Sequence, residues 1–398
     1  MPRPDILLLS ELYPPTIGGS GVLLENLYAR LPGLDVRVLA DGDEGSRVQH
    51  GLDVDTVSMA APDWGVMRPA CLARHRRVAR RVRELAPDPL TYVHCGRSLP
   101  EGLSAWWARR PFVCWTHGEE LGFASTSREL TWLMRRTYSR AAAILANSHN
   151  SARLLADWGV PAAKVVVVHP GVDVNRFSPT ADPGDWRLRF APRGEVVILS
   201  VGRLQRRKGH DLLLRALAQW NGNDPAVRYL IAGDGPHRAT LESDARALGL
   251  GDRVVFLGAV AEASLPGLYG ASDIFAMPNR QDGVDFEGFG IVFLEAAAAG
   301  RATIGGRSGG VPEAVQDGVT GVLVEGTDPG ELAAAIRRLA PASVRTAMGQ
   351  AGRARVLREF TWEHGARRVA DVHERLRAGR FGARPDARAS TAGNENHE

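Results

Sequence analysis

The most informative stretch of the sequence is Glu287-Gly-Phe-Gly-Ile-Val-Phe-Leu-Glu295-Ala-Ala-Ala-Ala-Gly300. It predicts a buried helix and therefore constrains the elements that surround it. Residues 290–299 are apolar apart from Glu295, which is typical of a buried helix, and Gly300 is a suitable residue to end it. A carboxylate in so apolar a helix needs partners, since an unpaired buried charge is costly. Glu295 is therefore either paired with a nearby arginine or turned towards a ligand, and both interpretations stay open.

The start of this helix favours an anion. Free backbone amides at Phe289, Gly290 and Ile291, with the helix dipole behind them, stabilise a bound anion by roughly 0.3–1 kcal/mol. A phosphate at this position would lie between Glu287 and Glu295, two groups that only accept hydrogen bonds. Because such groups suit a ligand with hydroxyls on both sides of the phosphate, the stretch predicts a sugar-nucleotide site.

Length and composition predict a soluble protein of two domains. A chain of 398 residues is too long for one ordinary core, and 44% hydrophobic with 24% charged residues is typical of globular proteins. No apolar run approaches the roughly 18–20 residues of a membrane helix, and Met1–Asp5 lacks the apolar core of a signal peptide. Cys71, Cys95 and Cys114 have no metal-ligand spacing, which predicts reduced thiols and a cytoplasmic location. The modest net charge of +4, without a long basic block, argues against a nucleic-acid partner.

Short apolar segments alternate with helix-length segments in both halves, which predicts an α/β fold with two doubly wound parallel sheets. In the first half the expected strands are Ile6–Ser10, Val36–Ala40, Val54–Ser58, Thr91–His94, Phe112–Trp115, Ala143–Asn147 and Val165–Val168. In the second half they are Val196–Val201, Arg228–Ala232, Val254–Leu257 and Ile274–Pro278. Turn-forming sequences place the boundary between the halves near residues 170–194.

Two loops of the first half lie where such a sheet binds ligands. Gly18 and Gly19 follow the first strand and precede a helix, although a tight turn would explain them equally well, and their spacing implies no dinucleotide site. His117 lies at the carboxyl end of another strand, beside a glycine, which makes it a candidate site residue. Glu119 and Glu120 are also compatible with a simple cap on the next helix.

A basic loop follows the first strand of the second half. Arg203 and Lys208 flank it, and two cations at a strand end can hold a diphosphate through charge-assisted hydrogen bonds of about 1.5–3 kcal/mol each. Lys208 is one of only two lysines in the chain, in which arginine otherwise supplies the positive charge. Arg206 and Arg207 are interpreted as the solvated part of this loop.

These motifs, in this order, resemble those of the family-four retaining glycosyltransferases, which have the GT-B fold. The resemblance rests on the E-x7-E pair, the Gly-Arg...Lys-Gly loop, the Pro-Pro...Gly-Gly loop and the His-Gly segment, and it covers roughly residues 6–375. It implies two Rossmann-like domains that face a cleft, with a C-terminal helix that crosses back to the first domain. The expected divisions are an acceptor domain (1–170), a linker (171–194), a nucleotide-sugar donor domain (195–360), the crossing helix (361–378) and a disordered tail (379–398).

The resemblance also implies roles for individual residues in hexosyl transfer with retention of configuration. Arg203 and Lys208 would bind the donor diphosphate, Glu287 the donor hexose, Glu295 the ribose and His117 the transferred sugar. Further donor contacts are expected from Gly18, Gly19, Gly258, Phe289, Gly290 and Ile291.

No cofactor and no catalytic metal are expected. Cleavage of the donor leaves negative charge on the nucleotide diphosphate, and preorganised cations and helix amides can stabilise that charge without a metal. The Asp-x-Asp pair of Asp53 and Asp55 falls in a predicted strand rather than in a loop suited to a metal ion.

Several alternatives stay open. The same fold could serve a sugar-nucleotide epimerase, a phosphorylase or a non-catalytic binding module. UDP-hexose, UDP-N-acetylhexosamine and GDP-mannose all suit the donor motifs, and the acceptor hydroxyl could belong to a glycan, a lipid or a small natural product. An arginine-rich helix expected over Ala70–Leu85, with Trp106 and Trp107, could contact the inner face of a membrane, but a solvated helix face and core tryptophans are the preferred interpretation. The sequence predicts no oligomeric state.

Overall fold

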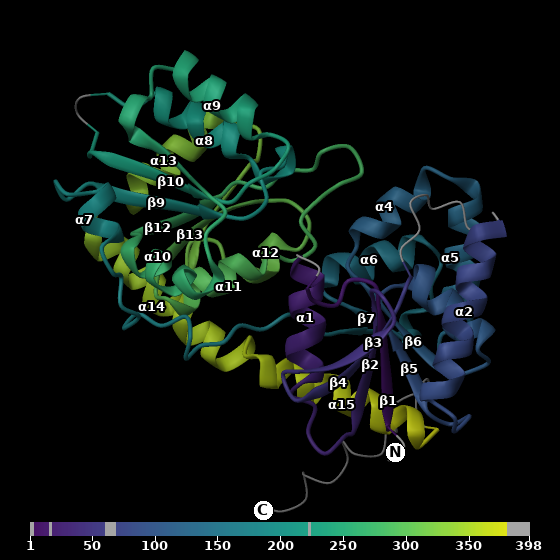
Figure 1. Ribbon diagram of the computed structural model, residues 1–398. Coiled ribbons are helices and arrows are strands. Elements are labelled where there is room, and N and C mark those ends of the chain that lie inside the picture. Colours follow the sequence, from purple (N-terminus) through teal and green to yellow (C-terminus); the bar gives the residue numbers. More distant parts are fainter. Residues whose placement is uncertain (1–3, 16–17, 60–68, 222–223, 380–398) are drawn as a thin grey trace, which may run out of the picture.

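A computed structural model describes residues 4–15, 18–59, 69–221 and 224–379, and these form two α/β units built on separate sheets (Figure 1). The first sheet has eight strands in the order β3-β4-β2-β1-β5-β6-β7-β8. The second has six strands in the order β11-β10-β9-β12-β13-β14. The two-domain GT-B expectation is therefore confirmed, whereas the residue limits given to each domain stay a prediction.

The first sheet is formed by short apolar strands with helices between them. Its strands are β1 (Ile6–Ser10), β2 (Val36–Asp41), β3 (Gly45–Gln49), β4 (Leu52–Val57), β5 (Tyr92–Cys95), β6 (Phe112–Thr116), β7 (Ala143–Ala146) and β8 (Val165–Val167). Its helices are α1 (Gly19–Tyr28), α2 (Pro69–Leu85), α3 (Leu103–Trp107), α4 (Glu119–Ser125), α5 (Arg128–Arg140) and α6 (His149–Asp157), with short turns η1 (Ser98–Gly102) and η2 (Ala162–Lys164).

The second sheet repeats this plan. Its strands are β9 (Val196–Val201), β10 (Val227–Ala232), β11 (Val254–Gly258), β12 (Ile274–Met277), β13 (Ala302–Gly306) and β14 (Gly321–Val324). Its helices are α7 (Trp186–Phe190), α8 (His210–Ala218), α9 (Arg238–Ala247), α10 (Leu265–Ala271), α11 (Ile291–Ala298), α12 (Val311–Ala314), α13 (Pro329–Leu339) and α14 (Ala342–Glu359). Short turns lie at η3 (Arg206–Lys208), η4 (Gly251–Arg253) and η5 (Glu262–Ser264).

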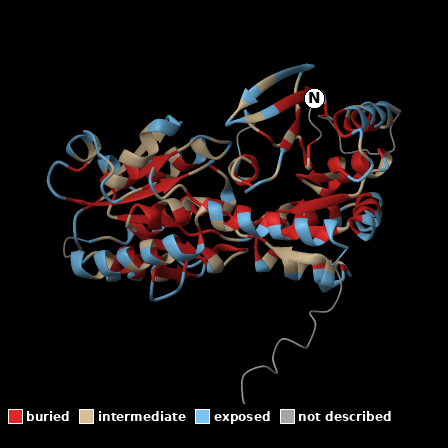
Figure 2. Cartoon of the chain, turned by 90° about the horizontal axis from the view of Figure 1, so that it is seen from below, coloured by how far each residue is buried: buried red, intermediate tan, exposed pale blue. Residues whose placement is uncertain are grey.

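Helices cover both faces of each sheet, so the central strands are buried on two sides (Figure 2). In the first unit α2, α3 and α5 pack on one face, and α1 packs on the other. In the second unit α8, α9 and α13 pack on one face, and α10 and α11 pack on the other. Burial on both faces explains why the strands appear in the sequence as continuous apolar runs instead of alternating patterns.

Two details of the first unit were not predicted from the sequence. The first sheet is not wholly parallel, because β3 pairs antiparallel with β4 at its edge. The sequence of β3, Gly-Ser-Arg-Val-Gln, is mostly polar and exposed, as suits an edge strand, and it therefore lacks the apolar signal of a core strand. Between β5 and β6 the chain forms the π-helical turn η1 and then α3, and Leu99 within the turn is extended with φ −131°.

The arginine-rich helix and the tryptophan pair have partners within the protein. Arg81 of α2 forms ion pairs with Asp55 at 2.8 Å and with Glu84 at 3.0 Å. The indole of Trp106 lies 4.2 Å from the guanidinium of Arg140, and it packs half-buried against the core of the first unit. These contacts agree with the preferred interpretation of a solvated helix face beside core tryptophans, and peripheral membrane contact stays a prediction.

The last helix, α15 (Trp362–Arg377), returns to the first unit, as Figure 1 shows. It lies against α1, and Trp362, Ala366 and Val369 join the apolar core on that face of the first sheet. The chain crosses between the units at two neighbouring points, because Val172 pairs with Thr361 and its N–H donates to the carbonyl of Phe360 at 2.9 Å. From residue 380 on, the predicted disordered tail lies outside the described residues.

We predict that the substitution Gly171→Ala destabilises this double crossing. A Cβ at Gly171 would lie 2.5 Å from the backbone nitrogen of Trp362, and backbone cannot move aside as a flexible side chain can. Overpacking of this kind costs about 1–3 kcal/mol, which denaturant unfolding monitored by tryptophan fluorescence can measure. Gly45→Ala is the control, because its Cβ would meet nothing nearer than 3.6 Å on an exposed edge strand. Equal stability of the two variants would contradict the prediction.

Candidate active site

Both sheets direct their chemistry-bearing loops to a topological switch point, where successive strands are added on opposite sides. In the second sheet β9 and β12 are neighbours, and the chain after β9 proceeds to β10 on one side while the chain after β12 proceeds to β13 on the other. In the first sheet the equivalent neighbours are β1 and β5. Loops that leave such a point diverge and expose a crevice at the carboxyl ends of the strands, which is where open α/β sheets bind ligands.

The carboxylate of Glu287 joins the two loops of the second sheet. Its Oε2 atom accepts hydrogen bonds from Arg207 at 2.7 Å, from Asn279 at 3.0 Å and from the ammonium of Lys208. Three donors on one oxygen fix the position of the carboxylate, and the other oxygen, Oε1, accepts no hydrogen bond within the described ranges. Glu287 can therefore receive a hydroxyl of a ligand without giving up its partners.

Charge in this cluster is nearly balanced before any ligand binds. Burial raises the pKa of Glu287, but Lys208 and Arg207 outweigh burial and lower the pKa to about 2, so Glu287 is ionised at neutral pH. Arg207 also pairs with Asp285 at 3.1 Å, which sets two cations against two carboxylates. Arg203, by contrast, is exposed and forms no ion pair with any described residue, so its charge is available to an anionic ligand.

The interpretation of Arg207 as a solvated loop residue is wrong. Its side chain is only 13% exposed and is held by Glu287 and Asp285, whereas Arg206 is 63% exposed and lies 3.9 Å from Asp282. The sequence offers no signal that separates two adjacent arginines in a three-residue turn. Asn279, in the loop before Glu287, is a second residue whose contact with Glu287 the sequence did not indicate.

The helix α11 begins at Ile291, after Gly290 in a left-handed conformation with φ 94°. No side chain caps its start, which leaves the first-turn amides near Phe289, Gly290 and Ile291 available to an anion. The helix ends as expected, with Gly300 at φ 72°. Arg207 and Lys208 bind Glu287, and α11 starts shortly after Glu287 in the chain. One diphosphate could therefore contact both the basic loop and the start of the helix.

Glu295 of α11 has a tyrosine as its direct partner. The hydroxyl of Tyr269 donates to its Oε2 at 2.7 Å, whereas the nearby Arg176 is engaged with Glu262 at 2.7 Å. Burial raises the pKa of Glu295, and the hydrogen bond from Tyr269 only partly opposes this. The pairing with an arginine that the sequence left open is therefore not the one that forms, and one carboxylate oxygen remains for a ligand.

His117 is neutral and fixed in one tautomer. Its Nε2 atom lies 3.0 Å from the carbonyl of Gly96, which can only accept, so Nε2 carries the hydrogen and Nδ1 presents a lone pair. Burial and the charge of Arg97 lower the pKa of His117 to about 3. Its amide donates to Glu120 at 2.9 Å. At neutral pH His117 carries no charge, and its Nδ1 can accept a hydrogen bond from a sugar hydroxyl.

Glycines let the two units touch at this site. A Cβ at Gly288 would lie 2.6 Å from the carbonyl oxygen of His117, and one at Gly122 would lie 2.5 Å from the carbonyl oxygen of Val284. Gly19 faces the side chain of Ile291 at 3.9 Å, so the first glycine loop does reach the start of α11. The structure thus brings Gly19, His117 and the start of α11 together across the two units.

Two other predicted donor contacts lie further out. Gly18 has no other residue within 4 Å of a Cβ position, and the adjoining residues 16 and 17 lie outside the described ranges. Gly258 ends β11, the edge strand beside β10, and its carbonyl accepts from Gly233 at 2.7 Å. Two strands, β10 and β9, therefore lie between β11 and β12, the strand that precedes Glu287.

A cavity of about 290 Å³ opens beside His117, between α4, α5 and the loop before Glu287. Its walls include the apolar side chains of Leu99, Phe123, Leu130, Met134 and Val284, and the charged residues that line it are Arg97, Glu119, Glu120 and Asp285. Oε2 of Glu120 is buried without a hydrogen-bond partner, and burial raises the pKa of this carboxyl to about 7. The cavity can therefore receive a molecule with both an apolar part and a hydroxyl group.

Two α/β units that meet at their strand ends, around an uncapped helix start and the carboxylates of Glu287 and Glu295, are the arrangement of a GT-B enzyme of the sugar-nucleotide type. Comparison with known proteins agrees. The model of Glycosyltransferase Family 4 matches residues 17–176, and that of Glycosyl transferases group 1 matches residues 188–355. The chain belongs to the family-four, or group 1, glycosyltransferases.

Two curated relatives cover most of the chain. A GDP-mannose-dependent alpha-(1-6)-phosphatidylinositol monomannoside mannosyltransferase of Mycolicibacterium smegmatis is 35% identical over 304 residues, covering 74% of this chain and 79% of the relative. The protein of the same description from Mycobacterium tuberculosis is 32% identical over 383 residues, covering 92% of this chain and 97% of the relative.

Solved structures share the fold at lower identity. Anabaena HepE, in complex with UDP and glucose, superposes with a TM-score of 0.78 at 22% identity, over 94% of this chain and 100% of the other. Sucrose-phosphate synthase from Thermosynechococcus elongatus gives a TM-score of 0.80 at 24% identity, over 95% of this chain and 100% of the other. At these identities the likeness supports the fold and nothing finer.

The Glu287 cluster leads to a prediction about stability. Glu287→Gln should lower the free energy of unfolding by about 3 kcal/mol at neutral pH, because it leaves Lys208 buried without its counter-charge. Since the folded-state pKa of Glu287 lies below its ordinary value of 4.5, the contribution is fully present above that value and is lost as the pH falls towards 2. Urea unfolding of both proteins, from neutral pH down to about pH 3, should show the difference shrinking. Glu242→Gln, which breaks a surface pair with Arg238, is the control, and an equal loss there would contradict the assignment.

Glu295 leads to a prediction about nucleotide binding. Glu295→Gln should weaken the binding of the preferred nucleoside diphosphate about ten-fold or more, because a hydrogen bond to a charged acceptor contributes about 1.5–3 kcal/mol. Since the pKa of Glu295 is raised, wild-type affinity should also fall as the pH drops towards it, whereas the affinity of the variant should not. Isothermal titration with GDP and UDP measures both effects. Tyr269→Phe, which keeps the carboxylate, is the matched variant, and unchanged affinity of Glu295→Gln would remove Glu295 from the ligand.

Proposed function

We propose that this glycosyltransferase is a retaining mannosyltransferase that uses GDP-mannose and transfers the hexosyl group to a hydroxyl of a partly apolar acceptor. The observation that carries the proposal is the open Oε1 of Glu287, held beside the uncapped start of α11, together with the exposed Arg203 in the loop that also supplies Arg207 and Lys208. This arrangement offers one acceptor to a hexose hydroxyl and several donors to a diphosphate. The choice of GDP-mannose is supported by the descriptions of both mycobacterial relatives.

The proposed reaction breaks the bond between the anomeric carbon and the diphosphate oxygen, and it forms a bond from that carbon to the acceptor oxygen on the same face. The acceptor proton passes to the leaving phosphate oxygen. Arg203 and the amides of residues 289–291 stabilise the charge that develops on the diphosphate, where preorganised electrostatics lowers a barrier most. Lys208 contributes from its fixed position beside Glu287, and neutral His117 holds a hydroxyl of the transferred sugar.

We place the acceptor in the cavity beside His117. The apolar side chains of its walls suit an apolar part of the acceptor. Arg97 and Glu120, which also line the cavity, can orient the reacting hydroxyl. Both mycobacterial relatives are described as acting on a phosphatidylinositol mannoside, and an acceptor with a lipid part fits the same cavity walls.

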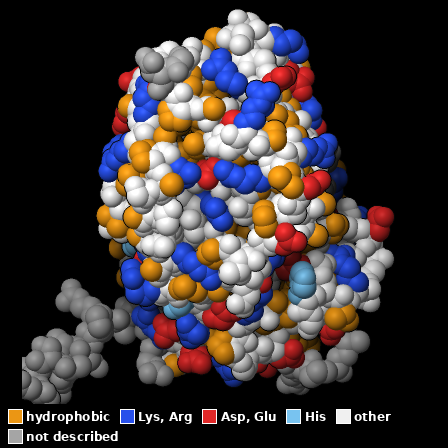
Figure 3. Space-filling model, turned by 90° about the vertical axis from the view of Figure 1, so that its left-hand side faces the viewer, with side chains coloured by type: hydrophobic (Ala, Val, Ile, Leu, Met, Phe, Trp, Pro, Cys, Tyr) orange, Lys and Arg blue, Asp and Glu red, His pale blue; other side chains and the backbone are white. Residues whose placement is uncertain are grey.

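Peripheral membrane contact at a cytoplasmic surface would suit such an acceptor. None of the described helices is long and apolar enough to cross a membrane. On the face of the second domain in Figure 3, Lys and Arg side chains lie scattered between apolar and acidic ones, without forming one basic patch. We place any membrane contact at the mouth of the acceptor cavity, beside α4 and α5 of the first domain.

The proposal predicts the donor, the product and the response to chelation. Among GDP-mannose, UDP-glucose and UDP-N-acetylglucosamine, GDP-mannose should raise the apparent melting temperature most, because the ligand that binds the native state most tightly stabilises it most. With a phosphatidylinositol mannoside as acceptor, mass spectrometry should detect one added hexose, and NMR of the product should show the same anomeric configuration as in the donor. Activity should survive excess EDTA, since cationic side chains take the part of a metal ion.

Separate outcomes contradict separate parts of this proposal. Transfer from UDP-glucose alone would overturn the donor assignment, and a product of inverted configuration would overturn retention. Loss of activity in EDTA that magnesium or manganese restores would show that the charge assignment is wrong. Phe123→Asp, which places a charge on the apolar wall of the cavity, should raise the KM for the acceptor and leave that for the donor unchanged.

A further inference from the structure

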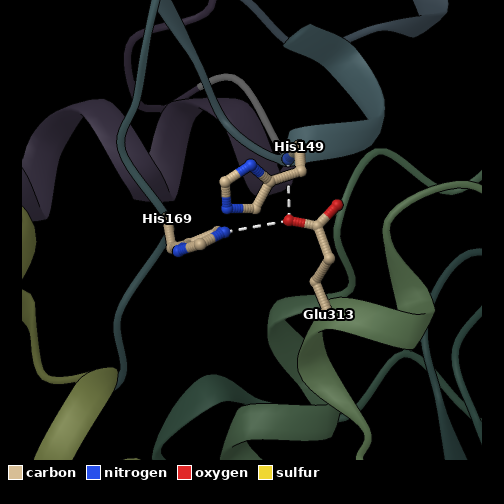
Figure 4. Close-up of side chains that lie close together, drawn as sticks. All are labelled: His149, His169 and Glu313. Atoms are coloured by element: carbon tan, nitrogen blue, oxygen red, sulfur yellow. Dashed lines mark hydrogen bonds and ion pairs between the residues drawn. The ribbon is translucent and has the colours of Figure 1, made fainter. Parts of the chain in front are cut away.

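Three side chains from separate segments meet at the junction of the two domains, away from the Glu287 cluster. His149 begins α6 of the first domain, His169 follows β8, and Glu313 belongs to α12 of the second domain. Figure 4 shows the three side chains close together, with Nε2 of His169 directed at the carboxylate and His149 joined to it by its backbone amide. Nε2 of His169 lies 2.9 Å from Oε2 of Glu313, and one potential ligand atom from each of the three residues lies within 4.8 Å of the others.

Two of the three groups are already held in place. The carboxylate of Glu313 accepts hydrogen bonds from the backbone amides of His149 at 2.7 Å and of Asn150 at 2.9 Å. The ring of His169 packs against the rings of Phe289 and Phe360, with centroid distances of 5.4 and 5.6 Å. Only His149 is exposed, and its ring lies against that of His169, with 5.3 Å between the ring centroids, without a hydrogen bond to any described residue.

The donor set suits zinc. Imidazole nitrogens and carboxylate oxygens are common zinc ligands. Magnesium and calcium prefer oxygen ligands, so a site with two imidazoles binds them poorly. Ligands about 2.0–2.2 Å from a tetrahedral ion lie roughly 3.3 Å from each other, close to the spacing of His169 and Glu313. A rotation of the exposed His149 side chain would bring the third nitrogen into range, and water would fill the fourth position.

We propose that His149, His169 and Glu313 form a zinc site that joins the two domains. The zinc ion takes the place of the hydrogen between His169 and Glu313 and adds His149 as its third protein ligand. Because its ligands come from both domains and from the segment between them, bound zinc fixes the domains against each other in the closed arrangement.

Fixed domains have a consequence for turnover that rests on the proposed function. If product release needs the domains to separate, zinc slows the reaction. The ion would act as an inhibitor and would take no part in the chemistry at Glu287, so chelation removes an inhibitor and leaves activity intact.

The test is a titration of untagged, metal-free protein with zinc chloride by calorimetry, and with cobalt chloride by visible absorption. We expect one equivalent of zinc per chain, cobalt absorption bands typical of tetrahedral coordination, and a zinc-dependent rise in apparent melting temperature. His149→Ala should weaken zinc binding about ten-fold or more and abolish these effects. The backbone amide of residue 149 still binds Glu313 in this variant, so the domain junction is preserved.

Two further variants sharpen the result. His149→Cys should restore zinc binding, since a thiolate is also a zinc ligand, and His50→Ala, which removes an exposed imidazole elsewhere on the first domain, should bind as the wild type does. Equal zinc affinity in wild type and His149→Ala, or no saturable binding in the wild type, overturns the proposal. Because binding is measured without substrate, this outcome is independent of whether the proposed transfer reaction occurs.

Discussion

The carboxylate of Glu287 is the contact on which the site depends. It accepts from a residue of the loop after β9 and from Asn279 after β12, and so it ties together two loops that diverge from the sheet. The same bonds hold Lys208 in a nearly buried position and leave Arg203 outside the pairing. A charged cluster is thereby assembled in advance, with one carboxylate oxygen and one guanidinium kept for the ligand.

Close approach of backbone to backbone is the second condition for this site. Gly209 has φ 75°, and a Cβ there would lie 2.1 Å from the carbonyl oxygen of Pro278, so only glycine lets the loop after β9 lie against the loop after β12. Gly122 and Gly288 serve the same purpose between the domains. Where side chains would hold the surfaces apart, these glycines let His117 come near the start of α11.

Much of the fold could be predicted from the sequence, because strands such as Ile6–Ser10 and Val196–Val201 are continuous apolar runs between loop residues. The edge strand β3 could not, since its side chains are mostly polar and exposed and its pairing with β4 depends on the neighbouring chain. In the site, the strand ends located Glu287 and Lys208 correctly within their loops. The partners could not be found in this way, because Tyr269 lies 26 residues from Glu295, and Arg207 differs from Arg206 only in which way a short turn directs it.

The return of α15 to the first sheet makes the first domain discontinuous in the chain. Residues 4–167 complete the strands of that sheet, yet one of its faces is finished only by side chains some two hundred positions later, among them Trp362, Ala366 and Val369. During synthesis this face is covered by α1 alone, and it stays partly exposed until the second domain has been made. The order of translation therefore does not match the order in which the two cores can close, and a fragment that stops at the linker would carry an apolar surface open to aggregation or to chaperones.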